Sequence, residues 1–177
     1  MADELTPKQR SALERAIKHP ELQLILFRKA DGLVWLNAFE AAGFLLPNLV
    51  PQPKEVEKGQ FQIPSWPVTE YLVGNAKYLQ DTEHLVSAQK VWNIIKEATF
   101  FARDNEYGNY RVWWQFSKII RVLPVNVIKD DYFSVISYWI TDKYERGLVG
   151  EQVFSWLSEL LDSEDKLSLE IASTLLG

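Results

Sequence analysis

Four side chains between residues 111 and 121 form the combination best suited to binding chemistry: Arg111, Trp114, Lys118 and Arg121. At 100° per helical residue, the first three share one face of a helix, and Arg121 lies close to it. Guanidinium groups pair with carboxylates and phosphates, and an indole ring stacks on cations. The pattern predicts either a surface for a carboxylate-rich or phosphorylated peptide, or a Trp114 covered by a neighbouring helix or loop with the cations at its rim. We expect the covered arrangement.

Local signatures of catalysis are missing from this sequence. It has no glycine-rich phosphate loop, no G-x-S-x-G motif and no H-E-x-x-H motif. It also has no cysteine, and its two histidines, His19 and His84, fall near the ends of different predicted helices. We therefore assign no catalytic residue, no metal site and no cofactor, although distant carboxylates can still meet in a fold.

Two acidic segments have the types of residue that bind metals. The segment 81–84 reads Asp-Thr-Glu-His, and Asp130 and Asp131 stand together. In the first turn of a helix, such side chains accept hydrogen bonds from free backbone N–H groups and complement the helix dipole. We interpret both segments as helix starts, with Asp81 or Thr82 as the cap of the first.

Composition limits the classes of protein to which the chain can belong. Its 177 residues, of which 47% are apolar and 13% aromatic, are enough for one domain with a core. The net charge of −5 makes general nucleic-acid binding unlikely, because phosphates require Lys and Arg. Residues 151–170 hold six acidic side chains and one lysine, which predicts a solvated helix surface, with an acidic docking patch as the alternative. The sequence has no cysteine, no signal peptide and no apolar run long enough to span a membrane. We therefore expect a cytoplasmic protein.

Residues 1–46 predict three helices. Thr6, Pro7 and Gln9 form an N-terminal capping signal, so the first helix begins at Pro7 and extends to about Lys18. A second helix begins at Pro20 and ends at the turn that Asp31 and Gly32 predict. The segment 33–46 supplies the third, with Trp35 and Phe39 on its apolar stripe.

Residues 47–66 predict one long proline-rich loop, with at most a short strand at residues 60–63. Helix resumes at Pro67, and Trp66 stands where a hydrophobic staple would fold onto Tyr71 or Leu72. We therefore interpret this loop as a plug held by its own apolar side chains, rather than as a binding site, with one rim of a groove as the role left open to it.

Residues 67–177 predict a series of amphipathic helices arranged as hairpins. We expect helices over 67–80, 82–102, 109–123, 130–142 and 151–162, and a last helix from about Ser163. The apolar positions after Val112 recur after Val153, 41 residues on, and the pair Leu85 and Trp92 recurs 47 residues on at Tyr132 and Trp139. Paired-helix repeats have periods of this size. The predicted fold is therefore all-α, with stacked antiparallel helical hairpins in a HEAT-like solenoid, or an irregular helical bundle as the alternative.

The segments "WLNAFEAAGFL", "PSWPVTEYL" and "IIRVLP", together with the proline-rich connection, resemble HEAT/armadillo-like helical-repeat segments of large uncharacterised bacterial proteins. The resemblance covers roughly residues 35–125 and carries no catalytic residue. It implies a non-catalytic scaffold or protein-interaction module, in some cases in defence against phage. The alternative is an enzyme whose dispersed carboxylates and tyrosines form a site that no local motif reveals.

The C-terminal segment predicts a helix with apolar residues on more than one face. They are Leu167, Leu169, Ile171, Ala172, Leu175 and Leu176. A helix of this kind requires a neighbour on each side, so we expect the chain to be part of a longer polypeptide or to self-associate through this helix.

Overall fold

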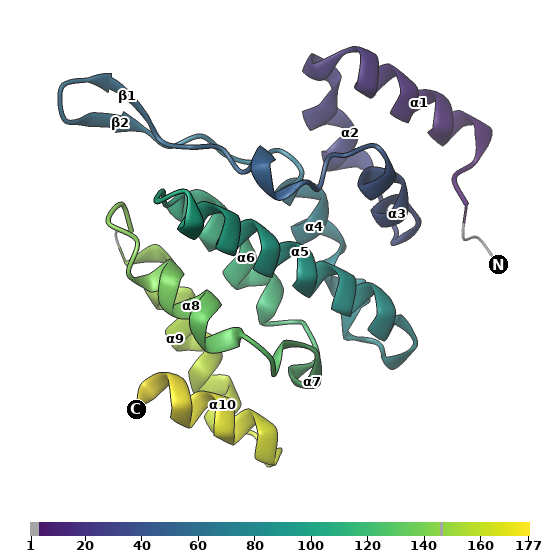
Figure 1. Ribbon diagram of the computed structural model, residues 1–177. Helices are drawn as coiled ribbons and strands as arrows, with labels where there is room; N and C mark the ends of the chain where they lie inside the picture. Colours follow the sequence, from purple (N-terminus) through teal and green to yellow (C-terminus); the bar gives the residue numbers. More distant parts are fainter. Residues whose placement is uncertain (1–3, 146) are drawn as a thin grey trace.

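The computed structural model describes residues 4–145 and 147–177, and within them the chain is mostly helical (Figure 1). The α-helices are α1 (Pro7–Lys18), α2 (Gln23–Lys29), α3 (Val34–Ala41), α4 (Thr69–Asn75), α5 (Leu85–Asp104), α6 (Tyr110–Ile120), α7 (Val125–Ile128), α8 (Tyr132–Ile140), α9 (Leu148–Leu161) and α10 (Lys166–Leu176). Short 3₁₀ helices cover Pro20–Leu22, Pro47–Leu49, Ala76–Gln80 and Thr82–His84. The all-α prediction is confirmed, because helices make up most of the described residues. The one sheet among these residues is small, the hairpin of β1 (Lys54–Glu57) and β2 (Gln60–Gln62). No helix in the described part of the chain has the length and apolar character needed to span a bilayer.

The helix starts agree in part with the sequence signals. Thr6 and Gln9 form the predicted capping box, in which each side chain accepts a hydrogen bond from the other residue's backbone N–H, at 3.3 and 2.8 Å. The cap expected from Asp81 is wrong, because its side chain makes no cap hydrogen bond and a 3₁₀ turn precedes α5. Asp131 does precede α8, but its φ is +65° and its carboxylate lies 3.2 Å from the Lys96 ammonium instead of capping the helix.

Contacts among the helices of residues 23–177 follow the direction of the chain but skip intervening helices. Helices α2, α4, α6, α9 and α10 contact one another in that sequence, and α5 contacts α7 and α8. Figure 1 places α1 and α10 at opposite ends of the molecule and shows the hairpin projecting away from the helices. This serial order means that residues on successive helices can form a continuous surface.

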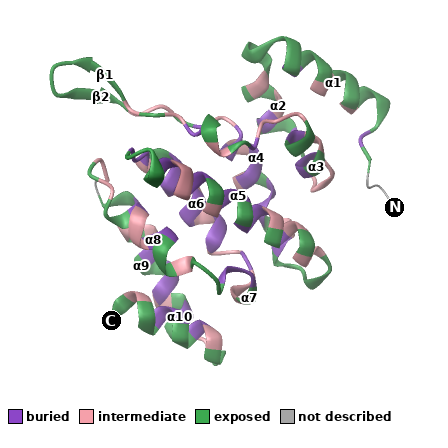
Figure 2. Cartoon of the chain, viewed as in Figure 1, coloured by how far each residue is buried: buried purple, intermediate pink, exposed green. Residues whose placement is uncertain are grey.

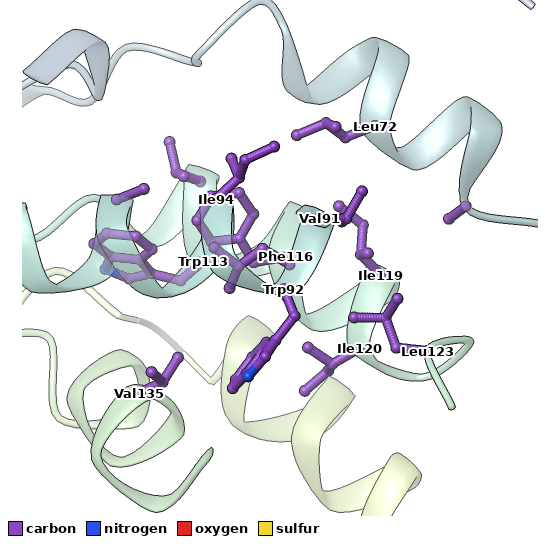
Figure 3. Close-up of a cluster of buried hydrophobic side chains, with 14 of the residues drawn as sticks. Leu72, Val91, Trp92, Ile94, Trp113, Phe116, Ile119, Ile120, Leu123 and Val135 are labelled. Carbon is purple, nitrogen blue, oxygen red and sulfur yellow. The ribbon is translucent and has the colours of Figure 1, made fainter. Parts of the chain in front are cut away.

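The centre of the core is aromatic. The Trp113 ring stacks on the Trp139 ring at a centroid distance of 6.3 Å, and Phe116 contacts both. The Trp139 indole N–H donates to the Thr99 hydroxyl on α5 at 2.9 Å, so α5, α6 and α8 share one buried cluster. Figure 3 shows Trp113 and Phe116 among the aliphatic side chains of this region. Trp66 also lies here, 6.3 Å from Phe116 in an edge-to-face contact, so its aromatic neighbour lies on α6.

A buried amide joins the N-terminal helices to α4. Asn75 is 4% exposed and donates to the Ala30 carbonyl at 2.9 Å, while its Oδ1 accepts from the Gly32 N–H at 2.7 Å. Tyr71 donates to the Gly32 carbonyl, and burial raises the pKa of its hydroxyl above the ordinary value. Because Gly32 has a φ of +92°, the turn suits glycine, and Asn75 holds it in place.

Two predictions about helices 67–177 are wrong in detail. Helix 67–80 is a shorter α4 followed by a 3₁₀ segment, and α7 lies where no helix was predicted. The proposed repeat agrees in burial at two of its four offsets, where Phe116 and Ile119 and their counterparts Leu157 and Leu160 are buried. It differs at the other two, where Phe154 and Leu161 are 64% and 46% exposed but Trp113 and Ile120 are completely buried.

Candidate functional site

A cleft lies between the β-hairpin, the start of α6 and the loop that precedes α9. It consists of two adjoining hollows, of about 540 and 570 Å³, which share Phe61, Ile63 and Tyr110 as lining residues. One hollow extends to Arg111, and the other extends to Lys143 and Tyr144. We call this region the hairpin cleft, and its lining combines three aromatic rings with two cations.

Two of the three rings of the hairpin cleft are in contact, and one of its cations lies over a ring. The Phe61 and Tyr144 ring centroids are 5.2 Å apart, so the hairpin touches the loop after α8. The Lys143 ammonium lies 4.9 Å from the Tyr144 centroid. Phe61 is 43% exposed, and Arg111 and Lys143 are exposed, so a ligand can reach both the apolar and the charged groups.

Asn109 holds the base of the hairpin on α6. Its side-chain amide donates to the carbonyls of Pro51 and Pro64, at 2.8 and 2.9 Å, which lie on the two arms of the hairpin. Its Oδ1 accepts from the Val112 N–H at 3.2 Å and so caps α6. The Tyr107 hydroxyl adds a bond to the Val50 carbonyl at 2.9 Å. Because these groups are buried and mutually satisfied, the hairpin leaves the helices at a defined position.

Asp142 holds the opposite wall of the cleft. Its carboxylate accepts from the Trp113 indole N–H at 2.8 Å and from the Tyr144 backbone N–H at 2.9 Å. Burial raises the pKa of this carboxyl above its ordinary value, although the two hydrogen bonds act in the opposite direction. Gly108 leaves room for the carboxylate, because a Cβ there would lie only 2.2 Å from one carboxylate oxygen. The orientation of Tyr144 therefore depends on a tightly packed polar contact.

The structure places the four residues singled out from the sequence in three different surroundings. Arg111 lies in the hairpin cleft, but the Lys118 ammonium lies 3.3 Å above the Trp114 ring and donates to Gln115. Burial lowers the pKa of Lys118, an effect that the nearby Glu70 partly offsets.

Arg121 is directed to α9, where it bonds to Glu159 and Gln152. Trp114 is partly buried, so the structure resembles the covered arrangement more closely than an open face. The reason is that α9 packs along α6 and supplies its own anion to Arg121.

The interpretation of residues 47–66 as a plug is correct only at its ends. Trp66 and Val50 are 3% and 2% exposed, but every residue of the two strands is exposed (Figure 2). The missed feature is the hairpin, which pairs Lys54 with Gln62 and Glu55 with Phe61. Its sequence signal was the turn at Gly59, whose φ is +78° and whose N–H is held by the Glu55 carboxylate.

The acidic segment before α5 brings possible metal ligands together. One ligand atom each from Asp81, Glu83 and His84 lies within 4.8 Å of the others. The two carboxylates are exposed, and acidic side chains on a surface turn often lie this close without a metal. The capping role expected for this segment is not observed, and no metal is assigned to it.

The chemical groups that line the hairpin cleft are suited to stacking and ion pairing, because its rings can stack and its cations can pair with anions. Among the described residues, its lining has no carboxylate or histidine that could act as an acid or base. Comparison of the chain with protein-family models, with curated proteins and with solved structures gives no match.

Proposed function

We propose that the chain is a non-catalytic protein-interaction module whose hairpin cleft binds an acidic, extended peptide segment of a partner. The observation that carries this proposal is the meeting of Phe61, Tyr110 and Tyr144 with Arg111 and Lys143 in a cleft whose described lining residues include no carboxylate. Aromatic rings supply rigid contact area at a low cost in side-chain entropy, and fixed cations select carboxylates over other groups.

The extended form of the ligand follows from the shape of the cleft. The two hollows lie next to each other along β2, which pairs with β1 on one side in this two-stranded sheet. The other edge of β2 can therefore accept backbone hydrogen bonds from an added strand. An acidic peptide suits the two cations better than a nucleic acid, since the chain has a net charge of −5 and nucleic acids require many phosphate contacts.

The architecture that we propose for this module is a HEAT-like stack of helical hairpins within a larger cytoplasmic bacterial protein, of the kind that includes phage-defence proteins. The serial contacts of α2, α4, α6, α9 and α10 support a stack, because each repeat of such a protein contacts its neighbours in chain order. The resemblance of residues 35–125 to helical-repeat segments supports the bacterial setting.

Self-association through α10 is a second part of this proposal. Leu169 and Leu176 are 38% and 49% exposed, whereas Ile171 and Ala172 on the same helix are buried. The two exposed leucines are seven residues apart and so lie on one side of the helix. An exposed apolar stripe of this kind is typical of a contact surface.

An enzyme with dispersed residues has less support. Two partly buried titratable groups near the cleft are Asp142 and Tyr138, and both already have partners. Asp142 accepts from Trp113 and Tyr144, and the Tyr138 hydroxyl donates to the Tyr107 carbonyl at 2.8 Å. Burial raises the pKa of Tyr138, so its hydroxyl gives up a proton less readily than that of an ordinary tyrosine. These contacts give both groups a structural role.

The cleft proposal can be tested by fluorescence polarisation with a labelled peptide of alternating Glu and Phe residues. The variant Arg111→Glu with Lys143→Glu is expected to weaken binding at least tenfold without a change in melting temperature, because both side chains are exposed. Lys129→Glu, an exposed cation outside the cleft, is the matched control and should bind as wild type. Equal binding by all three proteins would contradict the proposal, as would tighter binding of a labelled oligo-dT.

A further inference from the structure

An apolar groove lies at the N-terminal end of the molecule, between α1 and α2. It has a volume of about 360 Å³ and an apolar floor that includes Ala12, Leu22, Ile25 and Trp35. Ile25 is 55% exposed, and α1 buries only Ala16, so this helix pair has apolar surface that the described part of the chain does not cover. Figure 2 shows α1 as largely exposed.

The rim of this groove is basic. Lys8, Arg15 and Lys29 line it, and no acidic side chain does among the residues that the structure describes. Lys8 and Arg15 are seven residues apart on α1, so they lie on the same side of that helix. An occupant should therefore combine an apolar stripe with negative charge.

The C-terminal end of the same molecule has both properties. Leu169 and Leu176 form the exposed stripe of α10, and this helix also has one exposed anion, Glu170, and one exposed cation, Lys166. Asp162 and Glu164, in the turn before α10, are also exposed. The dimensions agree as well, since α10 has 11 residues and α1 has 12, which corresponds to helices of about 16–18 Å.

We propose that α10 of one copy docks into the α1–α2 groove of a second copy, so that the chain assembles end to end. The inference rests on the proposed self-association through α10 and identifies the surface that receives it. The leucines would cover Leu22 and Ile25, and Glu170 would face the basic rim. The groove and the stripe are different surfaces at opposite ends of the molecule (Figure 1), so the contact is heterologous. After each copy is added, the assembly still has one free groove and one free α10, at which further copies can bind.

Sedimentation velocity of the 177-residue chain over a range of concentrations tests this assembly. The average mass of the wild type should rise with concentration, and added salt should weaken association by screening the rim. Arg15→Glu blocks the groove, and Glu170→Lys blocks the helix. Each variant alone should raise the dissociation constant at least tenfold.

The decisive result comes from mixing these two variants. In the mixture, the Glu170→Lys helix meets the Arg15→Glu groove with opposite charge, and the unmodified helix of one variant meets the unmodified groove of the other. Association should therefore return to near the wild-type level. Phe133→Ser, which removes a 51% exposed apolar side chain on α8, is the matched control and should assemble as wild type.

Several outcomes would overturn the proposal. If Leu169→Ser and Glu170→Lys abolished association but Arg15→Glu did not, self-association through α10 would stand and the groove would be the wrong receptor. A wild-type chain that stays monomeric at millimolar concentration would contradict both ideas. A monomer that binds dodecanoate in a manner sensitive to Arg15→Glu would identify the groove as a ligand site instead.

Discussion

Gly108 offers the sharpest test of how the hairpin cleft is held. An added Cβ at this position would lie 2.2 and 2.4 Å from the two carboxylate oxygens of Asp142 and 2.3 Å from its Cγ. Real Cβ atoms almost never show contacts below 3.0 Å, so the carboxylate must move. It is not free to do so, because Trp113 and Tyr144 each donate a hydrogen bond to it.

The cost of Gly108→Ala can be estimated in two ways. Inserting a methyl group into a well-packed site typically costs about 1–3 kcal/mol. Displacing the carboxylate instead breaks two hydrogen bonds, at about 0.5–1.5 kcal/mol each. Both routes give about 1–3 kcal/mol, from which the lower entropy of the unfolded alanine chain subtracts about 0.4–1 kcal/mol. Urea denaturation should therefore show a loss of about 1.3 kcal/mol in the free energy of unfolding, within a range of about 0–2.6 kcal/mol, with an unchanged m-value.

A double-mutant cycle with Asp142→Ala isolates the cause. Asp142→Ala alone should destabilise the fold, because it leaves the Trp113 indole N–H without its partner. Once the carboxylate is absent, Gly108→Ala should add little, so the double variant should resemble Asp142→Ala. If the two losses added to within about 0.5 kcal/mol, the proposed clash between the Cβ and the carboxylate would be wrong.

Three further predictions concern the surroundings of the cleft. Trp66→Ala should cost about 3–5 kcal/mol, because it empties a buried aromatic site, and a melting temperature within a degree or two of wild type would contradict this. Asn109→Asp keeps the cap of α6 but loses both donors to the hairpin arms, so we expect a loss of about 1–3 kcal/mol and faster tryptic cleavage at Lys58. Because burial raises the pKa of Asp142 in the folded chain, its protonated form contributes stability that is fully present below the ordinary pKa of 3.8 and is lost as the pH rises through the folded pKa. The unfolding free energy of wild type relative to Asp142→Asn should therefore fall above about pH 4, and parallel pH profiles would refute this.

Helical elements were the most predictable part of this protein. The capping box of Thr6 and Gln9 and the apolar stripe of α6 are local features, and both are confirmed. Boundaries were less predictable where two forms of helix compete over a few residues, as in the 3₁₀ segments on either side of Asp81. The hairpin was predicted only as a short strand at residues 60–63, because the partner strand 54–57 is polar and has no apolar pattern.

The candidate site was predicted poorly for a related reason. Helical periodicity correctly placed Arg111 at the surface, but it says nothing about which other element lies over each turn. Tertiary packing gave Arg121 an anion from α9, set Lys118 on Trp114, and left Arg111 beside the hairpin.

The sequence by itself determined the helical class of the chain, the start of its first helix and the apolar faces that form the core. These properties depend on groups three or four residues apart, whose interactions the chain order specifies directly. Only the tertiary structure decided that Phe61, Tyr110 and Tyr144 line one cleft. Their meeting depends on hydrogen bonds that Asn109 makes with residues 45 and 58 positions away and on the packing of Asp142 against Gly108, which no local pattern encodes.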